Sequence, residues 1–298
     1  MATLRELKSR ISSVASSEKI TGAMKMISSA KMHKAEAALR KLVPYRSQIE
    51  TIIANLLNSD AAFYSPLVER HAEVKRVAFV VLGSDDGLCG AYNVNIAKRL
   101  VARIAELREQ YGSSIAIDIY PVGKKMIKIV SRFADSNINI VISADDLTPK
   151  SDSGQIKAFM ARLQEEFISN RVDIVDCVYM HFYSAGKQRI NIEQLMPIDN
   201  SVFTTEESIK KTAGRPYIFE PDAETIFRNI LPLFMISVVQ EIFVQNRASE
   251  QAARVMEMQS ANDNAKKLLE QLRLEFNKLR QQSITTELLD IVGGQIRD

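Results

Sequence analysis

Tryptophan is absent from this 298-residue chain, and cysteine and histidine are rare. The two cysteines, Cys89 and Cys177, form no CxxC pair, which excludes a cysteine-based zinc site or a disulfide framework. The histidines at positions 33, 71 and 181 lack the spacing of metal ligands. We therefore expect a protein of a reducing cytosolic compartment, without a metal or another cofactor.

Glycine and proline are both absent from Leu233 to Val292. Strong helix formers fill these roughly 60 residues, and a continuous helix of that length would extend about 90 Å. A compact globule of this chain length has a radius of gyration of roughly 19 Å, so it cannot contain such a helix. The helix must project, and its apolar face needs a partner.

A partner is available at the other end of the chain. The segment Ala2–Val43 contains a single glycine, Gly22, and no proline, so it can form a second long helix. Apolar residues recur there at helical spacing: Leu4, Leu7, Ile11, Val14, then Ile20, Ala23, Met24 and Ile27. The C-terminal stripe is Ala248, Ala252, Val255, Ala261, Ala265, Leu268, Leu272, Phe276 and Leu279. The two stripes predict a coiled coil. Serines dilute the first stripe, so we expect a surrounding partner to help hold the pair; a coiled-coil spacer is the alternative that periodicity alone favours.

Long hydrophobic runs are also lacking. No window approaches twenty apolar residues, so no transmembrane helix is expected. The helical pattern starts at once, with Arg5, Glu6 and Lys8, and we expect no signal or transit peptide.

The net charge of +3 is unevenly placed, because basic residues dominate the first helix. A basic helix suits nucleic acid, an anionic membrane surface or an acidic protein partner. Since the first aromatic residue is Tyr45, nucleic acid is the weakest of the three.

Between the two long helices, strand patterns alternate with helical ones. The expected elements are strands at 77–82, 114–120 and 138–142, helices at 94–110, 124–133 and from a cap at Ser153 to Phe167, and a hairpin of 173–182 with 188–195. This order predicts an α/β fold class, in which long N- and C-terminal helices form an antiparallel coiled coil around an inserted, doubly wound α/β domain. The expected divisions are a helix at 1–58, a Rossmann-like domain at 74–200, a connector at 201–221 and a helix at 222–298.

The loop after the first strand, Gly83–Asn93, is the one segment that resembles an active site. Its glycines at 83, 87 and 90 match neither the dinucleotide fingerprint nor a P-loop. Asp85 and Asp86 place negative charge where a phosphate would sit. We interpret the loop as a structural turn, and Cys89 as a small buried side chain rather than a nucleophile.

The C-terminal residues Ile284–Gln295, ITTELLDIVGGQ, resemble the C-terminal motif of the gamma subunits of F-type ATP synthases, with Gly294 where alanine is usual. Three further blocks are similar to the same family: Lys19–Met26, Gly87–Gly90 with Asn93, and Ala248–Arg254. Asp86 stands where family members usually carry arginine. The connector has no cysteine pair of the chloroplast kind, so the resemblance is to the bacterial type.

The resemblance implies a non-catalytic, rotary central-stalk subunit. Its coiled coil would turn inside a ring of three alpha and three beta subunits, and its α/β domain would bind the epsilon subunit and the ring of c subunits. It would couple proton-driven rotation to ATP synthesis or hydrolysis at the beta sites. The chain would be peripheral, held at the cytoplasmic face of the bacterial membrane only through the complex.

The resemblance also implies partner-binding positions. Met24 and Lys25 would face acidic loops of the beta subunits. Polar contacts to the ring are expected at Arg254, Gln282, Thr285 and Glu287, and an apolar sleeve around Leu288, Leu289, Ile291 and Val292. If Met24 is level with Arg254, the numbers of facing residues add to about 278, so that Leu7 meets Leu272.

Two other classes of protein compete with this interpretation. A nucleotide-binding α/β enzyme with a helical arm would depend on the glycine loop, and direct ATP binding would support it. A coiled-coil scaffold or nucleic-acid clamp would depend on the basic first helix, and salt-sensitive DNA binding would support it.

Overall fold

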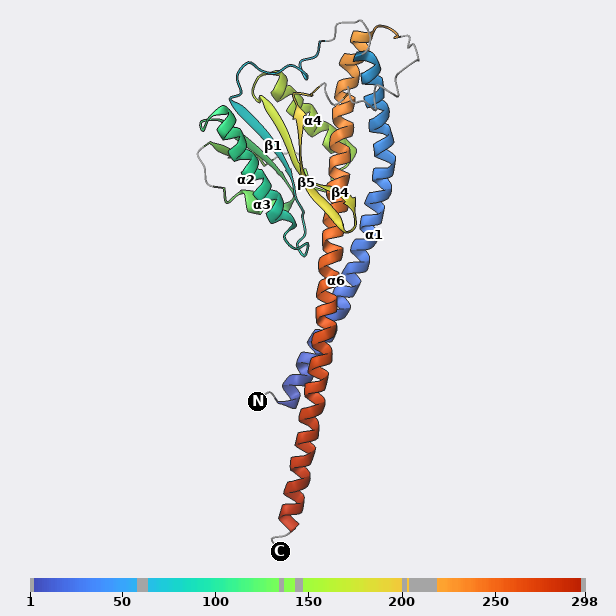
Figure 1. Cartoon of the computed structure of the whole chain (residues 1–298), viewed down its shortest axis with the longest axis vertical. Helices are drawn as coiled ribbons and strands as arrows, with labels where there is room; N and C mark the ends of the chain where they lie inside the picture. The colour runs from blue at the N-terminus through green and yellow to red at the C-terminus, as the bar shows by residue number, and fades with distance from the viewer. Residues whose placement is uncertain are drawn as a thin grey trace. The chain divides into compact units, whose positions relative to one another are not determined.

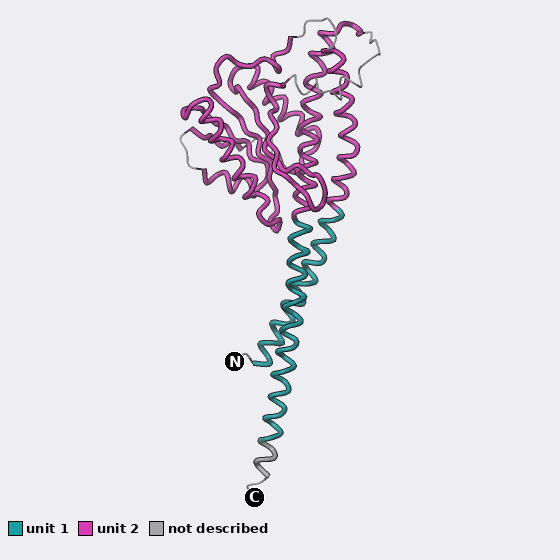
Figure 2. The backbone as a smooth tube through the Cα atoms, viewed as in Figure 1, with its two compact units in different colours: residues 1–30, 254–298 teal, residues 31–253 magenta. Residues whose placement is uncertain are grey.

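The computed structural model describes residues 3–57, 64–133, 137–142, 147–199, 203 and 219–295, with side chains up to Leu289. Its contacts group the chain into two compact units. Unit 1 contains residues 1–30 and 254–298, and unit 2 contains residues 31–253 (Figure 2). Both units include parts of the two long helices, α1 (Leu4–Leu57) and α6 (Ala223–Gln295). The division predicted from the sequence falls at 58, 74, 200 and 221, where one predicted element or domain ends and the next begins. That domain division stays a prediction.

Unit 2 is built on a five-stranded sheet of order β3-β2-β1-β4-β5. The strands are β1 (Arg76–Leu82), β2 (Ala116–Val122), β3 (Ile138–Ile140), β4 (Ile174–Ser184) and β5 (Lys187–Met196). The first four strands are parallel, and β5 pairs with β4 in antiparallel orientation. Apolar runs such as 77–82 suit this arrangement, because helices cover both faces of the central strands. The predicted α/β class and the β4–β5 hairpin are confirmed.

Helices lie on both faces of the sheet. On one face, α2 (Tyr92–Tyr111) and α3 (Lys124–Val130) pack through one apolar cluster that includes Phe79, Ile96 and Leu100. On the other face, α4 (Ser153–Ile168) and the unit 2 parts of α1 and α6 share a second cluster (Figure 1). The doubly wound arrangement is therefore confirmed.

The start of α4 differs from the prediction by one residue. The N-cap is Asp152, whose side chain accepts the backbone N–H of Gln155 at 2.9 Å, and Gln155 closes a capping box. Ser153, the predicted cap, is the first helical residue. Asp and Ser are both good N-caps, and the glutamine three residues after Asp152 selects between them.

Part of α6 is long and apolar enough to cross a membrane, with a mean hydropathy of 1.5 over its most apolar stretch. However, 61% of that stretch is buried inside the protein. Its side chains Phe227, Leu231, Val239 and Phe243 belong to the apolar cluster against the sheet. The packing of a core helix therefore accounts for the composition of this segment.

In unit 1 the two helices bury positions at 3–4 spacing, and most of the predicted apolar positions are among them; Ile20, Ala23, Ile27 and Leu268 are the exceptions. On α6 the less exposed positions include Met258, Asn262, Ala265, Leu269, Leu272, Phe276 and Leu279. On α1 they include Leu4, Leu7, Ile11, Val14, Glu18, Thr21, Lys25 and Ser28. The assignment of Leu268 to the stripe was wrong, because its side chain is 41% exposed and Leu269 is buried instead. The stripe continues through polar residues, which an apolar pattern does not reveal.

Candidate functional site

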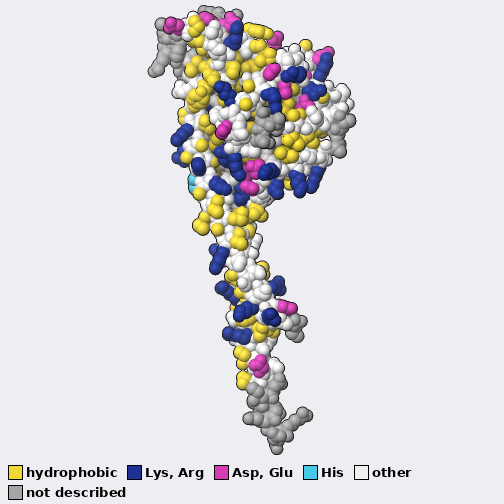
Figure 3. Space-filling view, turned by 180° about the vertical axis from the view of Figure 1, so that it is seen from behind, with side chains coloured by type: hydrophobic (Ala, Val, Ile, Leu, Met, Phe, Trp, Pro, Cys, Tyr) yellow, Lys and Arg dark blue, Asp and Glu magenta, His cyan; other side chains and the backbone are white. Residues whose placement is uncertain are grey.

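The most unusual surface of unit 1 is the middle of α1. Ile20, Met26 and Ile27 are exposed by 59%, 68% and 55%. The sequence pattern assigned Ile20, Ala23 and Ile27 to the helix seam, and that assignment was wrong, since all three are exposed. Hydrophobic side chains and basic side chains are interspersed on the face of this unit shown in Figure 3. Exposed apolar side chains grouped on one helix face mark an interaction surface.

The seam beside this surface is polar. The Asn262 side-chain amide donates to the backbone carbonyl of Glu18 at 2.6 Å and lies 3.3 Å from the Thr21 hydroxyl. A Cβ added at Gly22 would lie 3.4 Å from the same Asn262 nitrogen, so Gly22 lies at the same contact. A polar residue at a seam position fixes register and reduces stability.

These contacts correct the predicted register. Asn262 lies beside Glu18, Thr21 and Gly22, so the numbers of facing residues add to between 280 and 284 rather than 278. Leu7 and Leu272 are both buried, at 4% and 3% exposure. The contacts of Asn262 with Glu18 and Thr21 agree with the predicted antiparallel pairing.

The residues expected to bind partners differ in how much surface they offer. Gln282, Thr285, Glu287 and Leu288 are exposed along the last turns of α6, as is Leu289. Met24 and Lys25 are half-buried. Arg254 is only 6% exposed and so has little surface to offer a partner. The side chains of Ile291 and Val292 lie outside the described residues.

The glycine loop of unit 2 is held together by internal hydrogen bonds. The Ser84 backbone N–H donates to the Asn93 side-chain oxygen at 2.9 Å, and the Asn93 amide donates to the Ser84 hydroxyl at 2.8 Å. The Gly83 backbone N–H donates to the carbonyl of Val122 at 2.8 Å. Two backbone donors that a phosphate would need are therefore already used, which supports the interpretation of this loop as a structural turn.

The rest of the loop has no arrangement of a nucleophile with a base. Cys89 is 3% exposed, and its sulfur lies 3.8 Å from the Ser84 hydroxyl, which confirms that it is a buried side chain. The Asp86 carboxylate lies 3.8 Å from the exposed Lys150 ammonium. Among the side chains that the structure describes, no three His, Cys, Asp or Glu are grouped so that they could hold a metal ion.

Comparison with solved structures shows what the fold is similar to. The fold is similar to a chain of the rotor of the Euglena gracilis mitochondrial ATP synthase, with a TM-score of 0.57 over 94% of this chain and 98% of that one, at 19% identity. A chain from the central stalk and c-ring of the Tetrahymena thermophila mitochondrial ATP synthase gives a TM-score of 0.52 at 23% identity, covering 81% and 99%. Long helices with an inserted α/β sheet are thus a fold of rotor and central-stalk chains.

Sequence comparison then gives the family. The family model described as ATP synthase matches residues 3–295. The ATP synthase gamma chain of Bacteroides thetaiotaomicron is 39% identical and covers 100% of both chains, and that of Chromobacterium violaceum is 35% identical over 99% of both. The chain belongs to the family of ATP synthase gamma chains.

Proposed function

We propose that this chain is the rotating central shaft of a bacterial F-type ATP synthase, non-catalytic itself, at the cytoplasmic face of the membrane. Unit 1 would turn inside the ring of alpha and beta subunits, and the sheet domain of unit 2 would bind the epsilon subunit and the c-ring. Proton-driven rotation would bias the nucleotide affinities of the beta sites through the asymmetric surface of the shaft. Attachment to the membrane would come only through the complex.

One observation carries this proposal. In the middle of unit 1, α1 turns Ile20, Met26 and Ile27 outward, while the seam contains Glu18, Thr21 and Asn262. A stretch of a helix pair that exposes apolar side chains and places polar ones in its seam contributes little stability in water, because burial of apolar surface is the main stabilising term. A protein that surrounds the pair would cover these side chains.

The residues carried over from the family have distinct parts in this proposal. Lys25 would meet acidic loops of the beta subunits through its charge, and Met24 would contact the same loops. The exposed Gln282, Thr285 and Glu287 would make polar contacts to the ring. Leu288 and Ile291 would enter the apolar sleeve. Arg254 would act from within unit 1, with only its small exposed surface facing the ring.

The test is a pull-down of the tagged chain from native bacterial membranes. The alpha, beta, epsilon and c subunits should co-purify with the unmodified chain. Ile20→Glu with Ile27→Glu should lose most of the alpha and beta subunits, since both carboxylates would have to be buried without partners. The matched control is Val101→Glu on α2, another exposed apolar position at 50% exposure, which should retain both. Purification of the unmodified chain without alpha and beta, or with DNA instead, would refute the proposal.

A further inference from the structure

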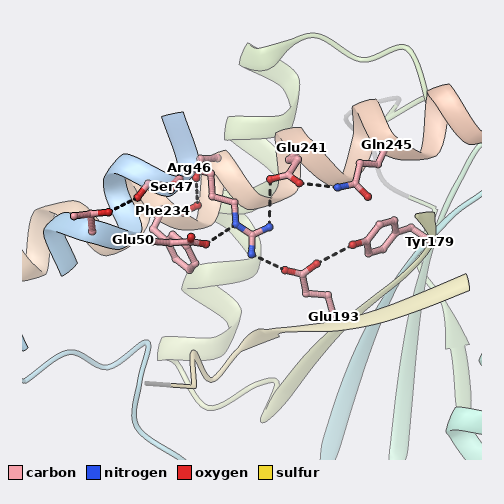
Figure 4. A network of polar contacts seen from close by, with 10 residues as sticks. Arg46, Ser47, Glu50, Tyr179, Glu193, Phe234, Glu241 and Gln245 are labelled. Atoms are coloured by element: carbon pink, nitrogen blue, oxygen red, sulfur yellow. Dashed lines mark hydrogen bonds and ion pairs between the residues drawn. The ribbon is translucent and has the colours of Figure 1, made fainter. Parts of the chain in front are cut away.

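A single arginine joins three elements of unit 2. Arg46 lies on α1, and its Nε donates to Glu50 Oε1 of the same helix at 2.8 Å. Its Nη2 donates to Glu193 Oε1 on β5 at 3.2 Å, and its Nη1 donates to Glu241 Oε2 on α6 at 3.3 Å. Each guanidinium nitrogen thus contacts a different carboxylate (Figure 4). We call Arg46, Glu50, Glu193 and Glu241 the arginine hub.

The carboxylates of the hub are themselves held in place. The Tyr179 hydroxyl on β4 donates to Glu193 Oε2 at 2.9 Å, and the Gln245 amide on α6 donates to Glu241 Oε1 at 2.6 Å. The Arg46 guanidinium also lies 5.8 Å from the centre of the Phe234 ring. The planar fork of arginine suits simultaneous contact with several carboxylates, and lysine cannot reproduce it.

The arginine hub contains more carboxylates than a single ion pair would need. Burial disfavours the Arg46 charge, yet Glu193, Glu241 and Glu50 outweigh burial and raise the pKa of Arg46 above its usual value. Three carboxylates against one arginine leave an excess of negative charge. Apolar side chains of similar volume would hold a helix to a sheet at least as firmly. The hub therefore calls for an explanation other than attachment alone.

The hydrogen bonds of the hub are directional, whereas the apolar packing around it is not. Ile49, Ile53 and Leu56 of α1 already pack in the apolar cluster with the sheet and α6. Such contacts are non-directional, so they resist separation more than sliding. The hydrogen bonds of the hub depend on angle and distance, so they resist displacement of α1 along β5 or along α6.

The other long helix has directional contacts of its own with the sheet layer. The Asn246 amide on α6 donates to the Gly83 carbonyl at 3.1 Å, and the Ser249 hydroxyl donates to the Met180 carbonyl at 2.9 Å. Within unit 2, Arg46 of α1 makes side-chain contacts with both β5 and α6.

From this geometry, and assuming the rotary function proposed above, we propose that Arg46 is the positioning residue that transmits torque between the sheet domain and α1. It locks α1 to β5 and α6 so that sheet and helices turn as one body. Its loss lets α1 slide under load, and part of each rotation is then not converted into work.

The test uses the assembled synthase in inverted membrane vesicles and measures protons pumped for each ATP hydrolysed. Arg46→Met should lower this ratio severalfold while ATP hydrolysis for each assembled complex is retained. Arg46→Lys should give an intermediate ratio, because one ammonium cannot serve three carboxylates in fixed geometry. A role in folding alone would reduce the amount of complex and leave the ratio unchanged. The matched control is Arg40→Met, which removes an exposed ion pair to Glu36 at 3.0 Å on the same helix and should change neither quantity.

A third variant separates the direction of the contacts from charge balance. Arg46→Met with Glu193→Met and Glu241→Met removes the two carboxylates on β5 and α6, leaves the partly exposed Glu50 on α1, and restores apolar packing between the elements. It should assemble well and stay poorly coupled. Full coupling in this variant, or an unchanged ratio in Arg46→Met, overturns the role of Arg46. Unmodified vesicles that lack this chain or do not pump would instead refute the rotary function, so the two failures are distinguishable.

Discussion

At the scale of single residues, Gly83 in the glycine loop and Gly186 in the β4–β5 turn show that two positions with the same residue type are not equivalent. A Cβ at Gly83 would lie 2.5 Å from Met126 Cβ and 2.7 Å from the Asn93 side-chain oxygen. The first of these atoms is close to the α3 backbone and cannot swing away. A Cβ at Gly186, in the turn between β4 and β5, would meet nothing within 4 Å.

We predict that Gly83→Ala destabilises the isolated chain by about 1–3 kcal/mol, because an inserted methyl in a close-packed interior forces shifts in its neighbours. Gly186→Ala should change stability by less than about 0.5 kcal/mol, as expected for a surface substitution without contacts. Urea titration followed by circular dichroism measures both. Equal midpoints for the two variants would show that α3 can move away from the loop at little cost.

At the scale of elements, the features that could be predicted from the sequence are those with a clear periodicity of apolar residues. The helices of the sheet domain and the β4–β5 hairpin follow from apolar spacing and turn residues, and their bounds agree within a few residues. Part of the seam of unit 1 was missed because Asn262, Thr21 and Lys25 occupy seam positions that an apolar pattern cannot identify. The arginine hub was missed for another reason: Arg46 is 147 residues from Glu193 and 195 from Glu241, so no local pattern connects them.

The observed register can be tested with a disulfide. Thr21→Cys with Asn262→Cys should form an intrachain disulfide in high yield, since their side chains approach to 3.3 Å across the seam. Ile20→Cys with Asn262→Cys is the matched control and should stay reduced, because Ile20 points outward. The native Cys89 and Cys177 are both buried and should not compete. Mobility shifts on non-reducing gels report the yield, and preferential crosslinking between two chains would contradict an intrachain helix pair.

At the scale of the whole molecule, the two units have different sources of order. Unit 2 has apolar clusters on both faces of its sheet. In unit 1, buried side chains become sparse toward the end of α6: among the described side chains from Arg280 to Leu289, Ser283 is half-buried and the others are exposed. Helicity in proteins comes mainly from packing of one face, and an isolated helix shorter than about 12–15 residues is marginal in water. The end of α6 therefore needs a partner from outside the chain.

We predict that the end of α6 is ordered only in the assembled synthase. Ile284, Leu288 and Leu289 are 49%, 57% and 67% exposed, and their burial in a sleeve would contribute about 1–2 kcal/mol each. Amide exchange from Ser283 onward should be fast in the isolated chain and slow in the complex. The segment from Met258 to Leu279, which packs against α1, serves as the internal control and should be protected in both states. Deletion of Leu288–Asp298 should weaken assembly and leave the melting of the isolated chain nearly unchanged. Equal protection of the end in both states would assign its order to packing within the chain, and the apolar sleeve would then have no role in holding it.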